Sequence, residues 1–591
     1  MGIIQHIQRA VSTGLSQLFD ESFSQTDFQI NQTKAEFEGD YTVVLFALVK
    51  KLKRSPEVLG KELGSHLTTE YPQYFSSYNV IKGFLNLTIS GEYWVDVLQD
   101  QYNNPSFGRG VNKGQKVMVE YCSPNTNKPL HLGHMRNNFL GWSIAEIFSA
   151  AGYDCIKTCI VNDRGIHICK SMISWQMFAN GATPASTGIK GDHFVGEYYV
   201  KFNDEYKKQV EALVTGGLSA EQAEKQAPIM LAAQEMLFKW EQGDEEVLTL
   251  WKEMNSWVYA GFEETWRRIG SDFEKIYYES ETYLEGKKYV EEGLQNNVFF
   301  RKDDGSVWID LTADGLDEKL VLRKDGTSVY ITQDIGLARR KYEDFKIDES
   351  ILVIGDEQNY HMKVLKLICQ KLKMPYADFM FHLSYGMVEL TTGKMKSREG
   401  TVVDADDMIE EMVSEAELKT RESGKAKDFT GQELQDLHEM IGIGAMKFYL
   451  LRVDPKKRMI FNPEESIDLH GFTATAVQYT HARIKSILRT ESPGNFQPGQ
   501  EYLFPLEKEL IRMLEGFPEI ISEACSEMNP SVLATYSYEL ARKFNSFYDV
   551  HSVIKAETPE KKELRLRIAQ MTANVIASAM GLLGIRVPER M

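Results

Sequence analysis

The chain carries Glu120-Tyr-Cys-Ser-Pro-Asn-Thr-Asn-Lys-Pro-Leu-His-Leu-Gly-His134 directly after the apolar run 117–119. This pattern predicts a strand, a loop and the first turn of a helix. The start of a helix presents unpaired N–H groups and a partial positive charge, which suit phosphate. His131 and His134 are three residues apart and share a helix face, while Gly133 leaves room for a flat base. The stretch therefore predicts a site for a nucleoside triphosphate.

A second motif, Gly393-Lys-Met-Lys-Ser-Arg-Glu-Gly400, lies far downstream. It places Lys394, Lys396 and Ser397 between two glycines, on a loop able to close over phosphates. Ammonium, imidazole and N–H donors stabilise the charge that develops as a phosphate bond breaks. Either motif alone is a weak signal, and the lysines alone would suit a solvated loop. Together the motifs predict a catalytic triphosphate site.

The middle of the chain alternates between strand and helix patterns, which predicts an α/β domain with a parallel, Rossmann-type sheet. In such a sheet the site lies at the carboxyl ends of the strands. We expect helices over 131–150 and 166–178, and strands over 117–121, 155–161, 328–331, 350–354 and 379–388.

At 591 residues the chain is too long for one core, and four parts are expected. They are an α+β domain (1–112), a Rossmann-type catalytic domain (113–405), a helical connection (406–463) and a helical bundle (464–591). Polar helical sequence marks one insertion in the catalytic domain at about 180–255. Two Asp-Gly hairpin signals mark a second at about 276–327.

The net charge of −18 argues against nonspecific nucleic-acid binding as the main role. Residues 466–591 hold 14 Lys and Arg against 15 Asp and Glu, a net of −1, so this end can still meet one RNA. No targeting segment or long apolar run is evident, so a cytoplasmic protein that binds no membrane is expected.

Six cysteines in so long a chain do not form a disulfide framework. Cys155, Cys159 and Cys169 with His167 raise the alternative of a zinc site. Their spacing fits no common ligand pattern, and the first two fall in an apolar run. Buried thiols, and no structural metal, are the preferred interpretation.

The two motifs together resemble the H-x-G-H and K-M-S-K-S signatures of class I aminoacyl-tRNA synthetases. Three flanking segments narrow the resemblance to arginyl-tRNA synthetases: 120–125, Val329-Tyr-Ile-Thr-Gln-Asp334 and Gly584-Ile-Arg-Val-Pro-Glu-Arg-Met591. The resemblance spans nearly the whole chain. It implies L-arginine, ATP with Mg²⁺ and tRNA(Arg) as reactants, no DNA partner, and a monomer. It also implies that the N-terminal domain contacts the tRNA corner and that 464–591 binds the anticodon.

The second motif departs from the family pattern, because Ser397 occupies the slot of its second lysine. Some members of the resembled family lack that lysine and carry one just before H-x-G-H, where this chain has Lys128. The resemblance therefore implies Lys128 as the main pyrophosphate-side cation, with Lys394 and Lys396 in support.

A guanidinium pairs best with carboxylates and stacks on aromatic rings. By resemblance, Glu120, Tyr330 and Asp334 recognise the arginine side chain, and Asn125 and Gln358 hold its α-amino and carboxylate end. An alternative makes Asp334 only a helix N-cap. The turn 355–361 resembles one that touches the ATP ribose in class I enzymes, which makes Asp356 and His361 candidates for that contact.

Aromatic and basic residues gather in the helical bundle, where bases would stack on rings and cations would meet phosphate. The alternative is that these rings are core residues of the bundle. The candidates for the RNA face are Tyr479, Arg483, Arg542, Phe544 and Tyr548.

Two rival functions stay open. A small-molecule nucleotidyltransferase with the same H-x-G-H motif would need neither the accessory domain nor the bundle. A synthetase-like RNA-binding protein without catalysis would be favoured by loss of a phosphate-binding residue. This chain retains Lys128, His131, Gly133 and His134.

Overall fold

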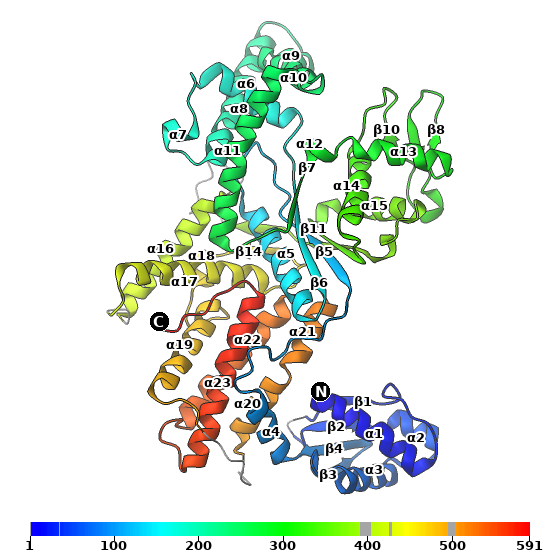
Figure 1. Ribbon diagram of the computed structural model, residues 1–591, viewed down its shortest axis with the longest axis vertical. Coiled ribbons are helices and arrows are strands. Elements are labelled where there is room, and N and C mark those ends of the chain that lie inside the picture. The colour runs from blue at the N-terminus through cyan, green and yellow to red at the C-terminus, as the bar shows by residue number, and fades with distance from the viewer. Residues whose placement is uncertain (1, 35, 391–402, 425–427, 495–502) are drawn as a thin grey trace.

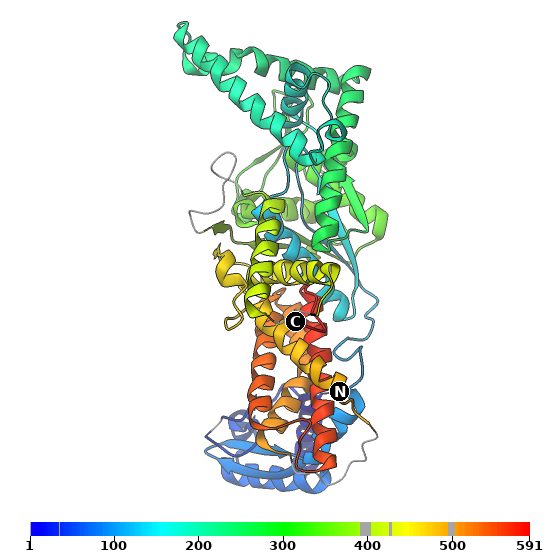
Figure 2. The ribbon, with the colours of Figure 1, turned by 90° about the vertical axis from the view of Figure 1, so that its left-hand side faces the viewer.

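The computed structural model describes residues 2–34, 36–390, 403–424, 428–494 and 503–591. The molecule is elongated: the N-terminal domain and the C-terminal bundle lie at one end, the central sheet in the middle and a helical insertion at the other end (Figures 1 and 2).

The N-terminal domain has a four-stranded antiparallel sheet in the order β1-β2-β4-β3, with α3 packed against the sheet and α1 packed against α3. Apolar side chains of α1, including Ile3, Ile7 and Val11, are buried in its core. Its elements are α1 (Ile3–Phe19), β1 (Gln29–Gln32), β2 (Tyr41–Val44), α2 (Phe46–Leu52), α3 (Pro56–Glu70), β3 (Phe75–Ile81), β4 (Phe84–Ile89) and α4 (Gly91–Gln101).

The central domain has a five-stranded sheet in the order β12-β11-β5-β6-β7, in which all neighbouring strands are parallel. The predicted fold class is confirmed. Short apolar runs form these strands because both faces of a parallel sheet are covered. The strands are β5 (Lys116–Glu120), β6 (Asp154–Val161), β7 (Lys275–Tyr278), β11 (Glu349–Gly355) and β12 (Met380–Tyr385), and the helices between them include α5 (Leu132–Ala150) and α14 (Tyr330–Phe345).

Three sequence predictions about this domain are wrong. The second insertion does not begin at 276, because β7 pairs with β6 and belongs to the central sheet. The expected strand 328–331 is instead the start of α14, where the backbone N–H of Val329 donates to the Thr332 hydroxyl at 3.2 Å. The expected strand 379–388 is interrupted at Gly386, where a Cβ would lie 2.7 Å from the backbone nitrogen of Arg458.

Two insertions project from the sheet (Figure 1). The first follows α6 (Ile166–Phe178) and is helical; the second follows β7 and α12 (Glu279–Thr282) and carries a small antiparallel sheet in the order β10-β9-β8. The first consists of α7 (Pro184–Thr187), α8 (Gly191–Thr215), α9 (Ala220–Gln226), α10 (Pro228–Glu241) and α11 (Glu245–Ile269). The second contains α13 (Glu285–Gln295), β8 (Phe300–Arg301), β9 (Val307–Ile309), the 3-10 turn η1 (Thr312–Asp314) and β10 (Lys319–Leu322).

A connecting region joins the sheet to the bundle, and in it β13 and β14 pair in parallel. It holds β13 (Val388–Leu390), α16 (Ala405–Ser423), α17 (Gly431–Leu451), β14 (Met459–Phe461) and α18 (Pro463–Ser466). The crossover from β11 to β12 within the central domain holds η2 (Asp356–Gln358), α15 (Asn359–Lys371) and η3 (Ala377–Phe379). The bundle holds α19 (Ala474–Thr490), α20 (Pro505–Glu515), α21 (Phe517–Ser526), α22 (Ser531–Val550) and α23 (Pro559–Leu582).

The N-terminal domain and the bundle lie side by side although they are far apart in sequence (Figures 1 and 2). Glu515 of α20 joins them: its Oε1 accepts from the Ile3 backbone N–H at 2.6 Å and from the Tyr93 hydroxyl at 3.0 Å. Lys508 and Asp40 add an ion pair at 2.7 Å. The N-terminal domain and the helical bundle are thereby fixed to one another.

Candidate functional site

The H-L-G-H motif forms the N-terminus of α5, where His131 is the N-cap and Leu132 the first helical residue. The Gly133 N–H donates to His131 Nδ1 at 3.2 Å, and the His131 N–H donates to His134 Nδ1 at 3.2 Å. The ring centroids are 3.8 Å apart. A Cβ on Gly133 would crowd the His131 ring at 3.1 Å, which explains the glycine.

Both imidazoles are neutral hydrogen-bond donors at physiological pH. Burial, aided by the Lys128 charge, lowers the pKa of His131 to about 4. Burial lowers the pKa of His134 as well, with help from His131 and Lys128. Since each Nδ1 accepts a backbone N–H, each neutral ring carries its proton on Nε2. These two N–H groups suit the non-bridging oxygens of a phosphate.

Asn137 holds the turn after β5 in place. Its Oδ1 accepts from the Cys122 backbone N–H at 2.6 Å, and its Nδ2 donates to the Val353 carbonyl at 2.7 Å. Cys122 and Ser123 have φ values of 79° and 26°, a conformation that costs energy and needs such support. Sequence reasoning missed Asn137, because the sequence shows that this residue is polar but does not show that it is buried.

Arg136 of α5 is buried and donates to the carbonyls of Met387, Pro455 and Lys457 at 2.8–3.2 Å. The described chain resumes at Val403, whose carbonyl accepts from the Leu132 N–H at 3.0 Å. The segments that flank the second motif are therefore bound to the helix that carries the first. The candidates Lys394, Lys396 and Ser397 lie outside the described residues.

Lys128 lies beside the two histidines, and burial lowers its pKa. Among the residues that the structure describes, no carboxylate lies within ion-pairing distance of its ammonium group. An unpaired, half-buried cation next to a helix N-terminus suits a polyanionic ligand.

Glu120 and Asp334 line one cavity beneath α14 and α15, together with Lys341. Glu120 is buried at the end of β5 and is ion-paired with Lys341 of α14. Asp334 Oδ2 lies 2.6 Å from His361 Nε2. Asp334 is the fifth residue of α14, whose N-cap is Val329, so the alternative of Asp334 as an N-cap is wrong. Lys341 is a partner that sequence reasoning missed.

The other candidates for arginine and ATP lie nearer the surface. Tyr330 opens α14 with 80% of its surface exposed, which leaves its ring free to cover a ligand. Asn125 is exposed and forms an isolated bridge with Asn162. Asp356 and Gln358 follow β11 on a 3-10 turn, and Gln358 is exposed. His361, a candidate for the ribose contact, lies against Asp334.

Glu279 is a further acid of this region that the sequence did not reveal. It follows β7 directly, and burial raises its pKa to about 7, opposed by Arg164 and reinforced by Asp163 and Asp334. The sequence gives no signal for Glu279, because residues 276–327 resemble an insertion outside the central sheet. Once β7 is part of the central sheet, its carboxyl end points to the same edge as β5 and β11.

Asp192, His193 and Asp406 bring ligand atoms within 4.8 Å of one another, a spacing that would suit a metal ion. The Lys190 ammonium already lies there, 2.7 Å from Asp406 and 3.1 Å from Asp192. The cluster is therefore an ion-pair network, and it ties the first insertion to the start of α16.

The candidate RNA face is partly core. Arg483 lies over the rings of Tyr479 and Tyr548, at 5.1 and 5.5 Å from their centroids. Arg542 is exposed and pairs with Glu539 at 2.7 Å. Phe544 is 0% exposed, so its ring offers no face to a base, and its prediction as an RNA contact is wrong. Within the described chain, none of the helices is long and apolar enough to cross a membrane.

Comparisons with known proteins agree with this geometry. The family described as "tRNA synthetases class I (R), catalytic domain" matches residues 98–462. "Arginyl tRNA synthetase N terminal domain" matches 5–89 and "DALR anticodon binding domain" matches 477–591. The parallel sheet, the H-L-G-H helix start and these matches define a class I aminoacyl-tRNA synthetase.

Curated relatives identify the family within this class. The arginine–tRNA ligases of Parabacteroides distasonis and Bacteroides thetaiotaomicron are 49% and 48% identical over 598 and 599 residues, covering 100% of this chain and of each relative. The chain belongs to the arginyl-tRNA synthetase family.

Solved structures share the fold. The Thermus thermophilus arginyl-tRNA synthetase matches with a TM-score of 0.79 at 23% identity, covering 99% of this chain and 100% of that one. The Plasmodium falciparum enzyme matches with a TM-score of 0.76 at 18% identity, covering 100% of this chain and 99% of that one.

Proposed function

We propose that this chain activates L-arginine with ATP, forming arginyl-adenylate and pyrophosphate, and transfers arginine to the 3′ adenosine of tRNA(Arg). The observation that carries the proposal is that the H-L-G-H helix start follows β5, whose last residue, Glu120, lines one cavity with Asp334. Full-length relatives that are arginine–tRNA ligases support it.

In the proposed first step the carboxylate of arginine attacks the α-phosphate of ATP, and pyrophosphate leaves. The two Nε2–H groups of His131 and His134 stabilise charge on phosphate oxygens, and Lys128 receives the leaving pyrophosphate. Gly133 gives the base access, and Asp356 is assigned to the ribose. Mg²⁺ accompanies ATP in this proposal, held by the phosphates of the substrate.

The arginine side chain is proposed to bind at Asp334, since a desolvated guanidinium needs a carboxylate. Glu120 is already paired with Lys341, so its role is to set the charge of the cavity and to share the guanidinium. Tyr330 covers the ligand, while Asn125 and Gln358 hold its α-amino and carboxylate end.

The bundle is proposed to bind the anticodon with Arg483, Tyr479 and Tyr548 as its stacking and charged surface and Arg542 at the edge. Lys394, Lys396 and Ser397 of the second motif are proposed to act on the phosphates together with Lys128. We further propose that the protein is a cytoplasmic monomer that binds neither DNA nor membranes. Size-exclusion chromatography tests the oligomeric state, and cell fractionation tests the location.

The decisive experiment is aminoacylation of total tRNA with each of the twenty amino acids in turn. Only arginine is expected to become attached. ATP–pyrophosphate exchange with and without tRNA, run in parallel, separates activation from transfer. Exchange with no attachment would identify a nucleotidyltransferase, and RNA binding with neither reaction would identify a binding protein.

A further inference from the structure

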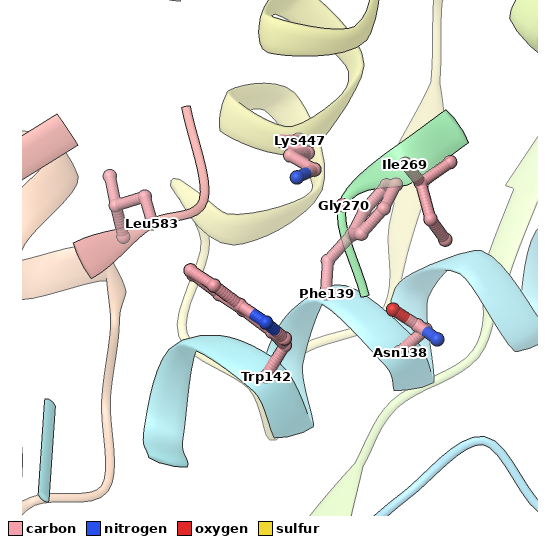
Figure 3. A pocket seen from close by; sticks show the side chains of 7 residues that line it. All are labelled: Asn138, Phe139, Trp142, Ile269, Gly270, Lys447 and Leu583. Carbon is pink, nitrogen blue, oxygen red and sulfur yellow. The ribbon is translucent and has the colours of Figure 1, made fainter. Parts of the chain in front are cut away.

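A second hollow lies on the molecule away from the H-L-G-H motif, where four segments meet. It is bounded by Trp142 of α5, by 267–270 at the end of α11, by 439–447 of α17 and by 581–586 at the C-terminal end. Its volume is about 450 Å³. We name it the junction cavity. Figure 3 shows a separate, tighter pocket that shares Trp142 and Lys447 with the junction cavity, and in it Lys447 extends from α17 toward Trp142 and Phe139.

The junction cavity is cationic in a protein whose net charge is −18. Arg267, Arg268, Lys447 and Arg586 line it, against one acid, Glu439. Glu439 is already engaged by Arg268 at 2.7 Å. The charges of Lys447 and Arg586 remain uncompensated, since no carboxylate of the described residues lies within ion-pairing distance of either.

Lys447 is a buried ammonium with donors to spare. Lys447 is 5% exposed, and its Nζ donates to the Gly584 carbonyl at 2.7 Å. That carbonyl satisfies one of three N–H groups. Burial lowers the pKa of Lys447 to about 7, with a smaller contribution from Arg586. A buried cation without a counter-ion is costly, and a bound anion would remove the cost.

The C-terminal end presents Arg586 from a fixed backbone. Its carbonyl accepts from Gln478 Nε2 at 2.8 Å, and the Pro588 carbonyl lies 2.9 Å from His481 Nδ1. The tail packs closely on α17 at Gly444, where a Cβ would lie 3.2 Å from Ile585. The backbone that carries Arg586 is therefore fixed, and its exposed guanidinium lines the cavity.

We propose that the junction cavity is a binding site for a phosphate group, with Lys447 and Arg586 as its charged contacts. An ammonium and a guanidinium together offer several donors to the oxygens of a phosphate. The group comes either from free inorganic phosphate or from the RNA backbone; the RNA source rests on the proposed function. Through Trp142 the cavity borders α5, the helix that begins with the H-L-G-H motif.

The test uses the full-length protein and two variants, Lys447→Met and Arg586→Gln. Arg590→Gln is the matched control, because Arg590 lies on the same tail but pairs with Glu433 at 2.8 Å outside the cavity. Inorganic phosphate is titrated calorimetrically with a non-hydrolysable arginyl-adenylate analogue occupying the catalytic site. The affinity for tRNA is measured against salt concentration in parallel, and ATP–pyrophosphate exchange is recorded for every variant.

Phosphate binding that is lost in both variants and kept in Arg590→Gln supports a free-anion site. Without phosphate binding, a tRNA salt slope that falls by roughly 1 in Arg586→Gln and not in the control supports an RNA phosphate. Phosphate binding that is unchanged in the variants, together with an unchanged salt slope, overturns the proposal. So does the absence of both signals. Exchange activity tests the proposed function separately, and Arg586→Gln keeps the test valid if Lys447→Met fails to fold.

Discussion

The carboxylate of Asp334 and the imidazole of His361 face each other, with Oδ2 2.6 Å from Nε2. The pair joins α14 to α15 at the cavity that also holds Glu120. The hydrogen bond to Asp334 raises the pKa of His361, while burial opposes the shift and the charge of Asp334 adds to it. In the absence of arginine, His361 is thus the partner of the carboxylate assigned to the guanidinium.

Arginine affinity is therefore expected to increase as the pH rises through the pKa of His361. Because that pKa is raised, protonated His361 is favoured in the folded state and competes with arginine at low pH. Deprotonation releases Asp334 above the usual histidine range of about 6.5. His131 and His134 do not obscure this change, since their pKa values are lowered. Arginine titrations from pH 5.5 to 8.5 measure it.

His361→Asn should remove the part of this pH dependence that comes from His361, leaving the part that comes from Glu279, whose pKa is raised to about 7, and should leave the affinity for ATP unchanged. A variant that loses ATP affinity and keeps the profile would instead assign His361 to the ribose, as the sequence had suggested.

Asp334→Ala should abolish arginine recognition while ATP still binds. Removing the carboxylate leaves a desolvated guanidinium unpaired, a loss of about 3–5 kcal/mol. Arginine and ATP are titrated separately, with Asp344→Ala as a control on the same helix, where the carboxylate pairs with Arg340 at 3.1 Å instead. Equal weakening of both ligands would contradict the assignment.

His134→Ala should slow formation of the adenylate by roughly 10²–10³-fold, because one donor to the developing phosphate charge is lost. Binding of tRNA should change little. Single-turnover adenylation and a tRNA-binding assay compare the two. The variant also removes the acceptor for the His131 backbone N–H, so circular dichroism checks that α5 still forms.

Much of the fold was predictable because it depends on local signals. The apolar run before Glu120 forms β5, and the periodic residues after His131 form α5 as expected. The exceptions arose where tertiary pairing overrode local preference. The short run 275–278 looks like part of a hairpin-rich insertion, and only its pairing with β6 makes it a strand of the central sheet.

The sequence predicted which residues form the site better than it predicted which of them pair with one another. Sequence placed Glu120 and Asp334 near one ligand, and both line one cavity. The sequence did not reveal that Lys341 is ion-paired with Glu120 or that His361 is hydrogen-bonded to Asp334. Those pairings depend on the packing of α14 and α15 over the sheet, and no spacing rule contains that information. Phe544 shows the same limit, since aromatic residues of a helix face serve a core and an RNA surface alike.

The bundle is expected to depend on one buried acid. Glu507 of α20 is fully buried and pairs with Lys561 and Arg565 of α23, each at 2.8 Å. Glu507→Gln removes the buried negative charge that Lys561 and Arg565 share, although Arg565 keeps Glu557 at 2.8 Å, and should destabilise the bundle by about 3–5 kcal/mol. Exposed Glu523→Gln is the control. Chemical denaturation followed by circular dichroism measures the shift, and an unchanged midpoint would show that water or other groups compensate.

Lys128 is expected to supply the charge that the second motif lacks at Ser397. Lys128→Ala should therefore be severe and Lys396→Ala milder, with kcat falling more than KM for ATP rises, because the cation acts as charge develops on the leaving pyrophosphate. Two facts favour this role: Lys128 is near both histidines, and it has no carboxylate partner among the described residues.

Ser397→Lys should then partly rescue Lys128→Ala, since both ammonium groups would serve the same phosphates. A solvated lysine with no role would instead give a change under about 1 kcal/mol and nothing to rescue. Steady-state kinetics on the three single variants and on the Lys128/Ser397 pair separate the outcomes. Near-normal activity of Lys128→Ala would mean that Lys394 and Lys396 suffice, and the leaving-group contact would then belong to the second motif alone.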